Sequence, residues 1–283
     1  MRVGYLGPPG TFAEEALLRL VGPEPEQTLV PFPTVIDCFE AVRSGAVPEA
    51  LVPIENSIEG SVNQTLDQLA AADGGIAILA QIVQPVRHHL SARHERPLSE
   101  ITRVFSHPHA TAQCTAYLRS ELPGVETVAT NSTADAVRIV SQSDEPWAAI
   151  GTLRAADIYG CAVLAADIED ARDNATRFIL LGREPRQAIG PGGFITSIIC
   201  VPPRDRPGVL LAILQEFAMR AVNLTKLESR PAKTGLGRYL FFIDMDGSRE
   251  RDMAVDAAIC AIEEQGVARA VFLGSYPTSA ASG

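Results

Sequence analysis

Hydrophobic and polar positions alternate with two different periods along the first two thirds of the chain. Short apolar runs typical of strands are followed by stretches with an apolar residue every third or fourth position, typical of helices. The runs that predict strands are 2–6, 29–32, 50–53, 76–83, 104–106, 125–129 and 148–150. The stretches that predict helices are 12–20, 35–43, 62–72, 110–121 and 134–140. This rhythm predicts an α/β fold built on largely parallel sheets.

The pattern changes beyond residue 182. Two prolines and a cluster of glycines make residues 183–193 a predicted linker. The strands then predicted are 195–201, 224–229, 238–245 and 267–273, with helices at 208–219 and 253–265. This βαββαβ order is typical of a ferredoxin-like module, which we expect over 194–276. Residues 1–182 are expected to form the larger domain, and the small, polar tail 277–283 is expected to be flexible.

Length and charge narrow the class of protein. A chain of 283 residues suggests two domains, and its 46% hydrophobic residues are enough for buried cores. The net charge of −10 argues against a nucleic-acid partner, because phosphate contacts need a basic face. Five scattered cysteines form no CxxC pair and are expected to be buried, reduced thiols. Without a signal peptide or a long apolar run, we expect a cytoplasmic protein with no membrane partner.

Four strand ends in the larger domain are followed by turns rich in hydroxyl and amide side chains, and each turn is expected to open a helix. These turns are 7–11, 55–61, 106–111 and 131–133. Free backbone N–H groups at a helix start attract carboxylates and phosphates. Several such starts at one edge of a sheet therefore predict a site for small anions. The alternative is that the Ser, Thr and Asn side chains only cap their helices.

Several other kinds of site are disfavoured. The first turn lacks both the GxGxxG spacing and the Gly-Lys-Ser/Thr of a phosphate loop. His107 and His109 precede Cys114, but Pro108 and the lack of a carboxylate partner argue against a metal site. No GxSxG pattern or Ser/His/Asp order indicates a nucleophilic triad.

Thr176 and Arg177 precede an apolar strand at 179–181. An arginine can bind a carboxylate through two parallel N–H donors, and a neighbouring threonine can add a hydroxyl. The alternative is a surface arginine beside a β-forming threonine.

Together these segments resemble the prephenate dehydratase family. The segments that carry the resemblance are Gly7-Pro8-x-Gly10-Thr11, Val52-Pro53-Ile54-Glu55-Asn56-Ser57, Ser106-His107-Pro108, Gln113-Cys114 and Thr176-Arg177-Phe178. The C-terminal module resembles the family's ACT domain through Pro207-Gly208-Val209-Leu210 and Glu228-Ser229-Arg230-Pro231. The resemblance covers essentially the whole chain. Val209 stands where the family often has alanine.

The resemblance implies a fold, a reaction and a set of site residues. Residues 1–182 would form two α/β lobes with the site between them, like a type II periplasmic binding protein. The reaction implied is the conversion of prephenate to phenylpyruvate, water and carbon dioxide, without metal or other cofactor. The catalytic residues implied are Thr176, Arg177, Asn56, Ser106 and Gln113. The substrate-binding residues implied are Gly10, Thr11, Glu55, Ser57, Ser132, Thr133 and Phe178.

Thr176 is expected to act as a hydrogen-bond donor to the leaving oxygen. A hydroxyl with a pKa far above neutrality is a poor general acid, so electrostatic stabilisation of the developing charge is the better explanation.

The ACT resemblance implies an effector and an assembly. L-Phenylalanine would bind where one subunit's loop meets another subunit's strand, in a homodimer or homotetramer. The effector-binding residues implied are Pro207, Gly208, Val209, Leu210, Asn223, Leu224, Glu228, Ser229 and Arg230. Two alternatives stay open: an arogenate dehydratase, whose substrate carries an amine in place of the keto oxygen, and a non-catalytic sensor of small anions.

Overall fold

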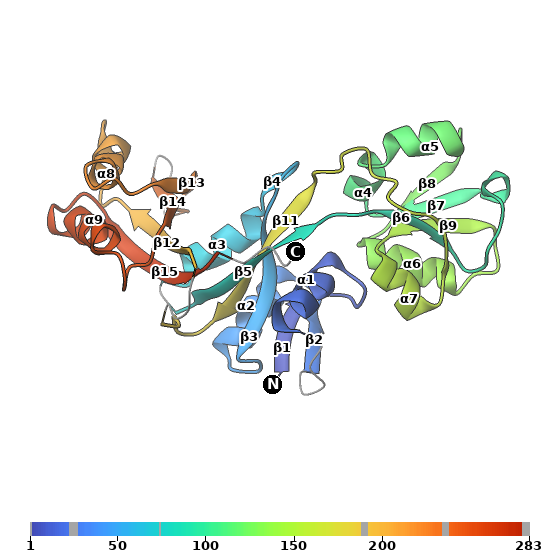
Figure 1. Cartoon of the computed structure of the whole chain (residues 1–283), viewed down its shortest axis with the longest axis horizontal. Coiled ribbons are helices and arrows are strands. Elements are labelled where there is room, and N and C mark those ends of the chain that lie inside the picture. The colour runs from blue at the N-terminus through green and yellow to red at the C-terminus, as the bar shows by residue number, and fades with distance from the viewer. Residues whose placement is uncertain (1, 23–27, 74, 188–191, 234–237, 279–283) are drawn as a thin grey trace. The chain divides into compact units, whose positions relative to one another are not determined.

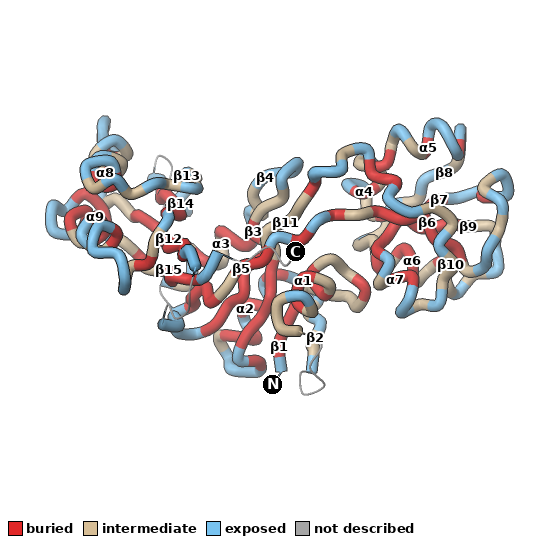
Figure 2. The backbone as a smooth tube through the Cα atoms, viewed as in Figure 1, coloured by how far each residue is buried: buried red, intermediate tan, exposed pale blue. Residues whose placement is uncertain are grey.

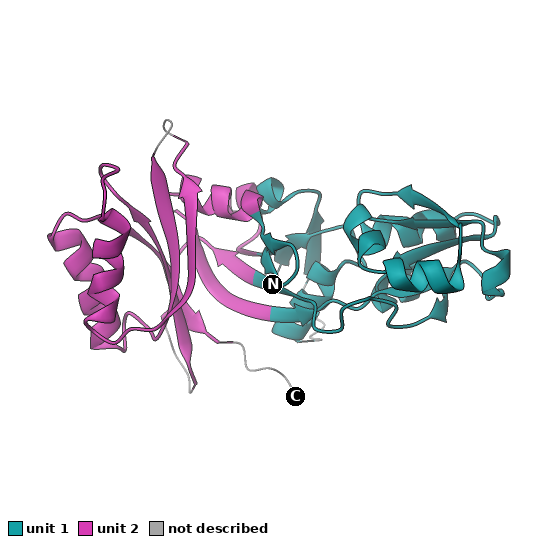
Figure 3. Ribbon diagram, turned by 90° about the horizontal axis from the view of Figure 1, so that it is seen from above, with its two compact units in different colours: residues 1–38, 51–62, 83–178 teal, residues 39–50, 63–82, 179–283 magenta. Residues whose placement is uncertain are grey.

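The computed structural model describes residues 2–22, 28–73, 75–187, 192–233 and 238–278 (Figure 1). These residues form two compact units, coloured separately in Figure 3. Unit 1 comprises residues 1–38, 51–62 and 83–178, and unit 2 comprises 39–50, 63–82 and 179–283. The boundary therefore crosses three strands of one sheet. Part of the predicted larger domain falls in the same compact unit as the C-terminal module.

The helices and strands follow the predicted rhythm closely. The helices are α1 (Phe12–Val21), α2 (Val35–Arg43), α3 (Asn63–Ala71), α4 (Pro108–Ala112), α5 (Thr115–Glu121), α6 (Thr133–Ser141), α7 (Leu153–Tyr159), α8 (Val209–Ala218) and α9 (Met253–Glu264). The first strands are β1 (Arg2–Leu6), β2 (Thr28–Phe32), β3 (Glu49–Asn56), β4 (Gly60–Ser61), β5 (Ala77–Pro85), β6 (His89–Ala92), β7 (Arg103–Ser106) and β8 (Glu126–Ala129). The later strands are β9 (Trp147–Gly151), β10 (Ala162–Ala165), β11 (Ala175–Gly182), β12 (Phe194–Val201), β13 (Leu224–Pro231), β14 (Tyr239–Asp246) and β15 (Arg269–Pro277).

The strands of the first part of the chain form two sheets. One has the strand order β2-β1-β3-β11-β5, with β4 paired to β3, and the other has the order β10-β6-β9-β7-β8. In the second sheet β7 pairs in parallel with β8 and β9, whereas β6 is antiparallel to β9 and β10. The prediction of largely parallel sheets was therefore only partly right. The antiparallel strands β6 and β10 were not predicted, although β7 and β8, which are equally short, were.

Each face of the second sheet carries a core, so its central strands β6, β9 and β7 are mostly buried, whereas the edge strands β8 and β10 are more exposed (Figure 2). Leu90, Val104 and Ile150 pack on one face with α4 and α5. Phe105 and Ala149 pack on the other with α6 and α7. This two-sided burial explains why these strands are continuously apolar rather than alternating.

In unit 2 the C-terminal module forms an antiparallel sheet with the order β13-β14-β12-β15, covered on one face by α8 and α9 (Figure 3). Its core includes Ile198, Ile213, Phe217, Ile243 and Ile259. This topology confirms the predicted ferredoxin-like βαββαβ fold. The last strand ends at Pro277, one residue beyond the predicted end of the module, and the backbone N–H of Thr278 still donates to Gly193.

The same unit joins this module to helix α3. The Arg230 guanidinium on β13 donates to the carboxylate of Asp67 at 2.8 Å and to the side chain of Asn63. Lys233 also donates to Asp67, at 2.7 Å. These charge-assisted bonds connect a residue of the predicted effector signature with a helix that directly follows the β3–β4 hairpin.

Candidate active site

The β3–β4 hairpin positions Asn56. Its Oδ1 accepts hydrogen bonds from the backbone N–H groups of Ile58 at 2.9 Å and Glu59 at 3.0 Å, which is an Asx turn. Residues 55–61 were expected to form a turn that opens a helix; they form the β3–β4 hairpin, and helix α3 begins at Asn63 directly after it. With its oxygen held by the backbone, the Asn56 amide has a single orientation, and its nitrogen faces β11.

Thr176 lies beside that nitrogen, near the start of β11. The Asn56 Nδ2 donates to Thr176 Oγ1 at 3.0 Å, and its second proton is shared between Asn174 Oδ1 at 2.9 Å and the Ala175 carbonyl at 3.2 Å. An amide NH₂ group can only donate, so the Thr176 oxygen must be the acceptor. The hydroxyl proton of Thr176 is therefore not used by Asn56 and is available to a ligand.

A chain of side-chain amides, which we call the amide chain, leads away from Thr176. It consists of Asn56, Asn174 and Gln113. Asn174 Nδ2 donates to Gln113 Oε1 at 3.0 Å, and the ring Nε2 of His88 lies 3.0 Å from the same oxygen. The Oγ of Ser57 adds a bond to Asn174 Oδ1 at 3.2 Å. Three predicted site residues, Asn56, Gln113 and Thr176, are thus brought together by Asn174.

Gln113 reaches this place because the predicted helix 110–121 is broken into two. The residue is the C-cap of α4, and Cys114 is the N-cap of α5. The backbone carbonyl of Gln113 accepts from Asp170 at 2.7 Å, which anchors the break. The apolar periodicity continues through both helices, so it gave no sign of the interruption.

Arg177 pairs with Glu55. Its Nη2 lies 3.2 Å from Glu55 Oε2, and the arginine side chain is largely buried. Successive side chains of a strand point to opposite faces, so Arg177 and Thr176 leave β11 in opposite directions. The role of Arg177 as a carboxylate ligand stays a prediction, with Glu55 as its present partner.

At the other predicted helix starts, the polar side chains form hydrogen bonds within the protein. The Ser106 hydroxyl is fully buried and donates to the Ile150 carbonyl at 2.9 Å. Ser132 caps α6 by accepting from the Asp135 N–H at 3.0 Å. Thr11 donates to the Leu6 carbonyl at 3.0 Å. These bonds favour a capping or structural role, as in the alternative considered above. Thr133 is the first residue of α6. Phe178 belongs to β11, and its side chain is buried in the hydrophobic core.

The Gly10 loop is closed by two groups that the sequence pattern did not indicate. The Gly10 N–H donates to Glu14 at 2.6 Å, and Arg154 of α7 holds both oxygens of that carboxylate, each at 2.9 Å. Thr152 donates to the Gly10 carbonyl at 2.7 Å. The Gly10 backbone is therefore bound within the protein, in contrast to the open anion site predicted for it.

The histidine pair does not form a metal site. His107 caps α4, with its Nδ1 accepting from the His109 N–H at 3.4 Å, and His109 pairs with Glu59 at 3.4 Å. Across the described residues, no group of three His, Cys, Asp or Glu side chains is arranged for a metal ion. Burial lowers the pKa of His107, and its neighbour His109 lowers it further, so the ring is neutral near pH 7.

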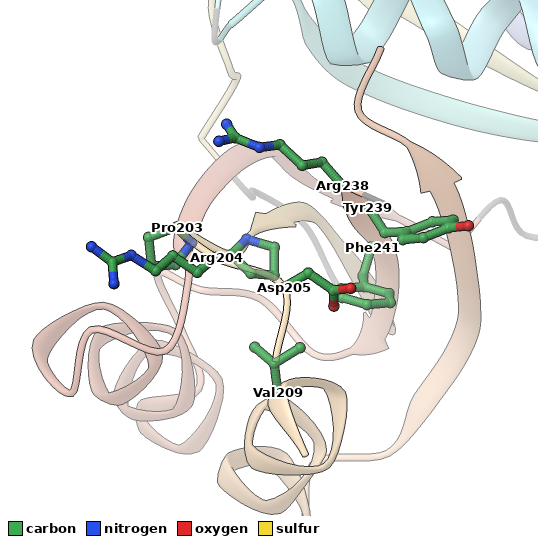
Figure 4. Close-up of a pocket in the computed structure, with 8 residues that line it drawn as sticks. Pro203, Arg204, Asp205, Val209, Arg238, Tyr239 and Phe241 are labelled. Atoms are coloured by element: carbon green, nitrogen blue, oxygen red, sulfur yellow. The ribbon is translucent and has the colours of Figure 1, made fainter. Parts of the chain in front are cut away.

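In the C-terminal module, Gly208 is the N-cap of α8 with a left-handed φ of 84°, and Val209, the first residue of the helix, is buried. A pocket beside this helix start is shown in Figure 4, where the Arg204 and Arg238 guanidinium groups extend outward. It is lined by Pro202, Pro203, Arg204, Asp205, Val209, Arg238, Tyr239 and Phe241. Of the other predicted effector residues, Asn223 bonds Asp246 at 2.7 Å and Glu228 pairs with Lys226 at 3.4 Å.

None of the helices in the described part of the chain is both long and apolar enough to span a membrane. All five cysteines are free; Cys38, Cys114 and Cys200 are buried as expected, whereas Cys161 and Cys260 are only half-buried. Fold and site together define an α/β protein with a hydroxyl–amide site in its first part and a ferredoxin-like module in its second.

Comparison with known proteins identifies the family to which the chain belongs. Residues 3–186 match the prephenate dehydratase family model, and residues 203–254 match the ACT domain. The chain belongs to the prephenate dehydratase family. A prephenate dehydratase from Bacillus subtilis is 35% identical over 98% of both chains.

Solved structures agree with this assignment. The prephenate dehydratase of Arthrobacter aurescens, solved in complex with L-Phe, has a TM-score of 0.90 and 38% identity, covering 99% of this chain and 90% of that one. A protein named GqqA, described as a novel type of quorum quenching acylase, has a TM-score of 0.85 and 28% identity over 99% of this chain and 98% of its own. The second likeness shows that function must be argued from the site.

Proposed function

We propose that this chain catalyses the decarboxylating dehydration of prephenate to phenylpyruvate, water and carbon dioxide, within L-phenylalanine biosynthesis. The observation that carries the proposal is the orientation of the Thr176 hydroxyl. Asn56 donates to its oxygen at 3.0 Å, which leaves the proton to donate to a ligand. Family membership supplies the substrate, and this donor supplies the chemical role.

The reaction makes a modest demand on the protein. The C–O bond to the ring hydroxyl breaks, the ring carboxylate leaves as carbon dioxide, and the electron pair of its C–C bond completes the aromatic ring. One proton is consumed as the departing hydroxide becomes water. A fixed donor at the leaving oxygen stabilises the negative charge that develops there, and one such donor is typically worth about 10²–10³ in rate.

We propose Thr176 as that donor and Asn56 and Gln113 as the residues that hold it, with Asn174 between them. Arg177 is proposed as a ligand of a substrate carboxylate, exchanging or sharing its Glu55 partner. Ser57 supports the amide chain through Asn174. Gly10, Thr11, Ser106 and Ser132 have weaker support, because their polar groups bond within the protein, and Thr133 is the first residue of α6.

The test is turnover of both candidate substrates by the full chain. We expect phenylpyruvate from prephenate, with a kcat/KM above that for arogenate. A preference for arogenate would transfer the assignment to the alternative dehydratase. Binding of prephenate without product would indicate the sensor.

We further propose that L-phenylalanine binds the ACT module and regulates the enzyme. Support comes from the ferredoxin-like fold and from the L-Phe complex of the relative from Arthrobacter aurescens. Residues 1–182 are assigned to catalysis, 183–193 to a linker of which 188–191 lie outside the described residues, and 194–276 to regulation. We propose a cytoplasmic location, because five free cysteines suit a reducing compartment. We also propose a homodimer or homotetramer, as the ACT resemblance implies.

A further inference from the structure

His88 is a buried histidine to which neither the sequence patterns nor the reaction assign a role. Its side chain lies at the end of the amide chain, and the residue is only 2% exposed. It follows β5 and precedes β6, and Phe12 of α1 packs edge-on against its ring, with the ring centres 5.6 Å apart. Because the His88 ring is packed in this way, it can influence the amide chain only through the ring atom that faces Gln113.

That atom is Nε2, which lies 3.0 Å from Gln113 Oε1. The identity of the Gln113 atom follows from its other partner, because Asn174 Nδ2 donates to it at 3.0 Å. Asn174 in turn has its oxygen toward Asn56 and Ser57, which both donate to it. Each amide orientation is thus fixed by the next, starting from the Asx turn at Asn56.

The orientation of the amide chain determines the tautomer of His88. An amide oxygen only accepts, so the Nε2 that faces it must carry the proton. The other nitrogen, Nδ1, is then the bare one, and it is buried without a hydrogen-bond partner among the described residues. Burial lowers the pKa of His88, although its bond to Gln113 and the nearby Glu169 charge oppose the shift, so the ring is neutral near pH 7.

The charged groups around His88 are consistent with a fixed neutral ring. The His88 backbone N–H donates to Glu169 Oε2 at 2.9 Å, and Arg87 binds the other oxygen of that carboxylate at 2.8 Å. Glu169 is therefore engaged by the backbone and by an arginine. The neighbouring His89 uses its Nδ1 to accept from the Asp167 N–H at 3.2 Å, outside the amide chain.

We propose that His88 is a positioning residue whose neutral Nε2–H tautomer anchors the end of the amide chain and, through it, the Thr176 hydroxyl. The hydrogen bonds that begin at Asn56 set the orientation of each amide, and the His88 donor holds the last of them, Gln113, in place. Without this donor the Gln113 oxygen keeps only its bond from Asn174, so the Gln113 side chain gains freedom of movement. That freedom passes to Asn174 and loosens the contact of Asn56 with Thr176.

The proposal rests on the proposed function for its kinetic consequence, but the tautomer can be measured without any substrate. Long-range ¹H–¹⁵N correlation NMR of the full chain distinguishes the two ring nitrogens, and His88→Gln assigns the signals among the five histidines. At about pH 7.5 we expect His88 with a protonated Nε2 and a bare Nδ1. A protonated Nδ1, in either the neutral or the charged ring, overturns the proposal.

Kinetics of folded variants test the positioning role. His88→Leu removes the donor, and we expect kcat to fall by about three- to tenfold with little change in KM, as the loss of one neutral hydrogen bond predicts. In His88→Gln the side-chain amide can replace the Nε2 donor, so it should recover most of that loss. His89→Gln, at the adjacent buried histidine, is the matched control and should retain wild-type kcat.

Equal kcat values in the Leu and Gln variants of His88, or an effect confined to KM, would overturn the positioning role. If His88→Leu does not fold, the NMR tautomer and the ratio of kcat between His88→Gln and His89→Gln still decide. Absence of turnover in the wild-type chain would contradict the proposed function instead, and would leave the tautomer as the test of this inference.

Discussion

At the scale of single residues, the hydrogen bonds of the Asn56 side-chain amide determine the direction in which the Thr176 hydroxyl can donate. The Asn56 oxygen is taken by two backbone N–H groups, and its nitrogen is turned toward Thr176 as a consequence. A threonine that accepts from this nitrogen must direct its own proton elsewhere. The hydroxyl is thus prepared as a donor before any substrate arrives, which is the arrangement that favours stabilisation of a leaving oxygen.

Asn56→Asp separates the two functions of this amide. The carboxylate can still accept from Ile58 and Glu59, so the Asx turn should be retained. Its other oxygen would face two acceptors, Asn174 Oδ1 and the Ala175 carbonyl, so the melting temperature should fall while the variant still folds. The carboxylate cannot donate to Thr176, and it would instead accept the hydroxyl proton. We expect kcat to fall by about 10²-fold, the effect of losing one catalytic donor. Steady-state kinetics on prephenate checks this, and near-normal kcat in the folded variant would show that the donor is not needed.

The buried histidines predict a pH dependence of stability. Burial lowers the pKa of His88 and of His89 below the ordinary 6.5. Below pH 6.5 the unfolded chain therefore binds protons that the folded chain does not, and the free energy of unfolding must decrease as the pH falls. Urea unfolding at about pH 7.5 and 5.5 should show this loss, and His88→Gln should show a smaller one. An equal loss in the variant would mean that His88 does not contribute.

At the scale of helices and strands, the periodicity of apolar positions predicted most elements, but not those that shape the site. The helix over 110–121 is two helices, because Gln113 turns its carbonyl to Asp170 and its side chain to the amide chain. Polar contacts between residues far apart in sequence decide such breaks, and apolar periodicity does not encode them. Helix α7 was missed for a related reason, since its seven residues give too few turns for a clear period.

Three of the site residues that the family resemblance implied lie close together. Residues 56, 113 and 176 were chosen from the family resemblance, and they lie on one connected set of hydrogen bonds. His88, which completes this set, is deeply buried. Its contribution was not predictable, because a histidine beside an apolar residue looks the same in sequence whether or not its ring meets a partner.

The contact between the Gly10 loop and helix α7 predicts a packing effect on stability. Gly10 has a φ of +88°, and a Cβ built there would lie 2.8 Å from the Cα of Ala155. Gly124→Ala is the matched control, since its φ of +79° is similar and no atom lies within 4 Å of the added carbon.

We expect Gly124→Ala to cost about 1–2 kcal/mol from backbone strain alone. Gly10→Ala should cost about 1–3 kcal/mol more because of the overpacking. Urea unfolding at 25 °C measures both. Equal losses in the two variants would contradict the close packing of Gly10 against α7.

At the scale of the whole molecule, a physical link within unit 2 connects the regulatory module to the first part of the chain. Arg230 and Lys233 both bond Asp67 of α3, and together they lower the pKa of this carboxylate against the opposing effect of burial. Helix α3 begins at Asn63, which follows the hairpin that holds Asn56. A change at β13 would therefore reach the hairpin that holds Asn56 through one short helix, provided that the proposed effector favours one of two states.

Asp67→Asn weakens this link without removing an effector residue. We expect saturating L-phenylalanine to lower kcat/KM by a factor about two- to fivefold smaller than in the wild type, as the loss of a partly buried ion pair suggests. Asp73→Asn is the control, because the Arg269–Asp73 pair at 2.7 Å is more exposed. Inhibition assays with and without effector measure the factor. Unchanged inhibition in Asp67→Asn would mean that the link does not transmit regulation.

The measurement that tests the central claim most directly is phenylpyruvate formation from prephenate by the wild-type chain and by Thr176→Val, which removes the hydroxyl and keeps the shape. We predict turnover by the wild type and a fall in kcat of at least about 10²–10³ in the variant, with the fold and melting temperature retained. Near-normal kcat in a folded Thr176→Val protein would contradict the role of Thr176 as the donor to the leaving oxygen.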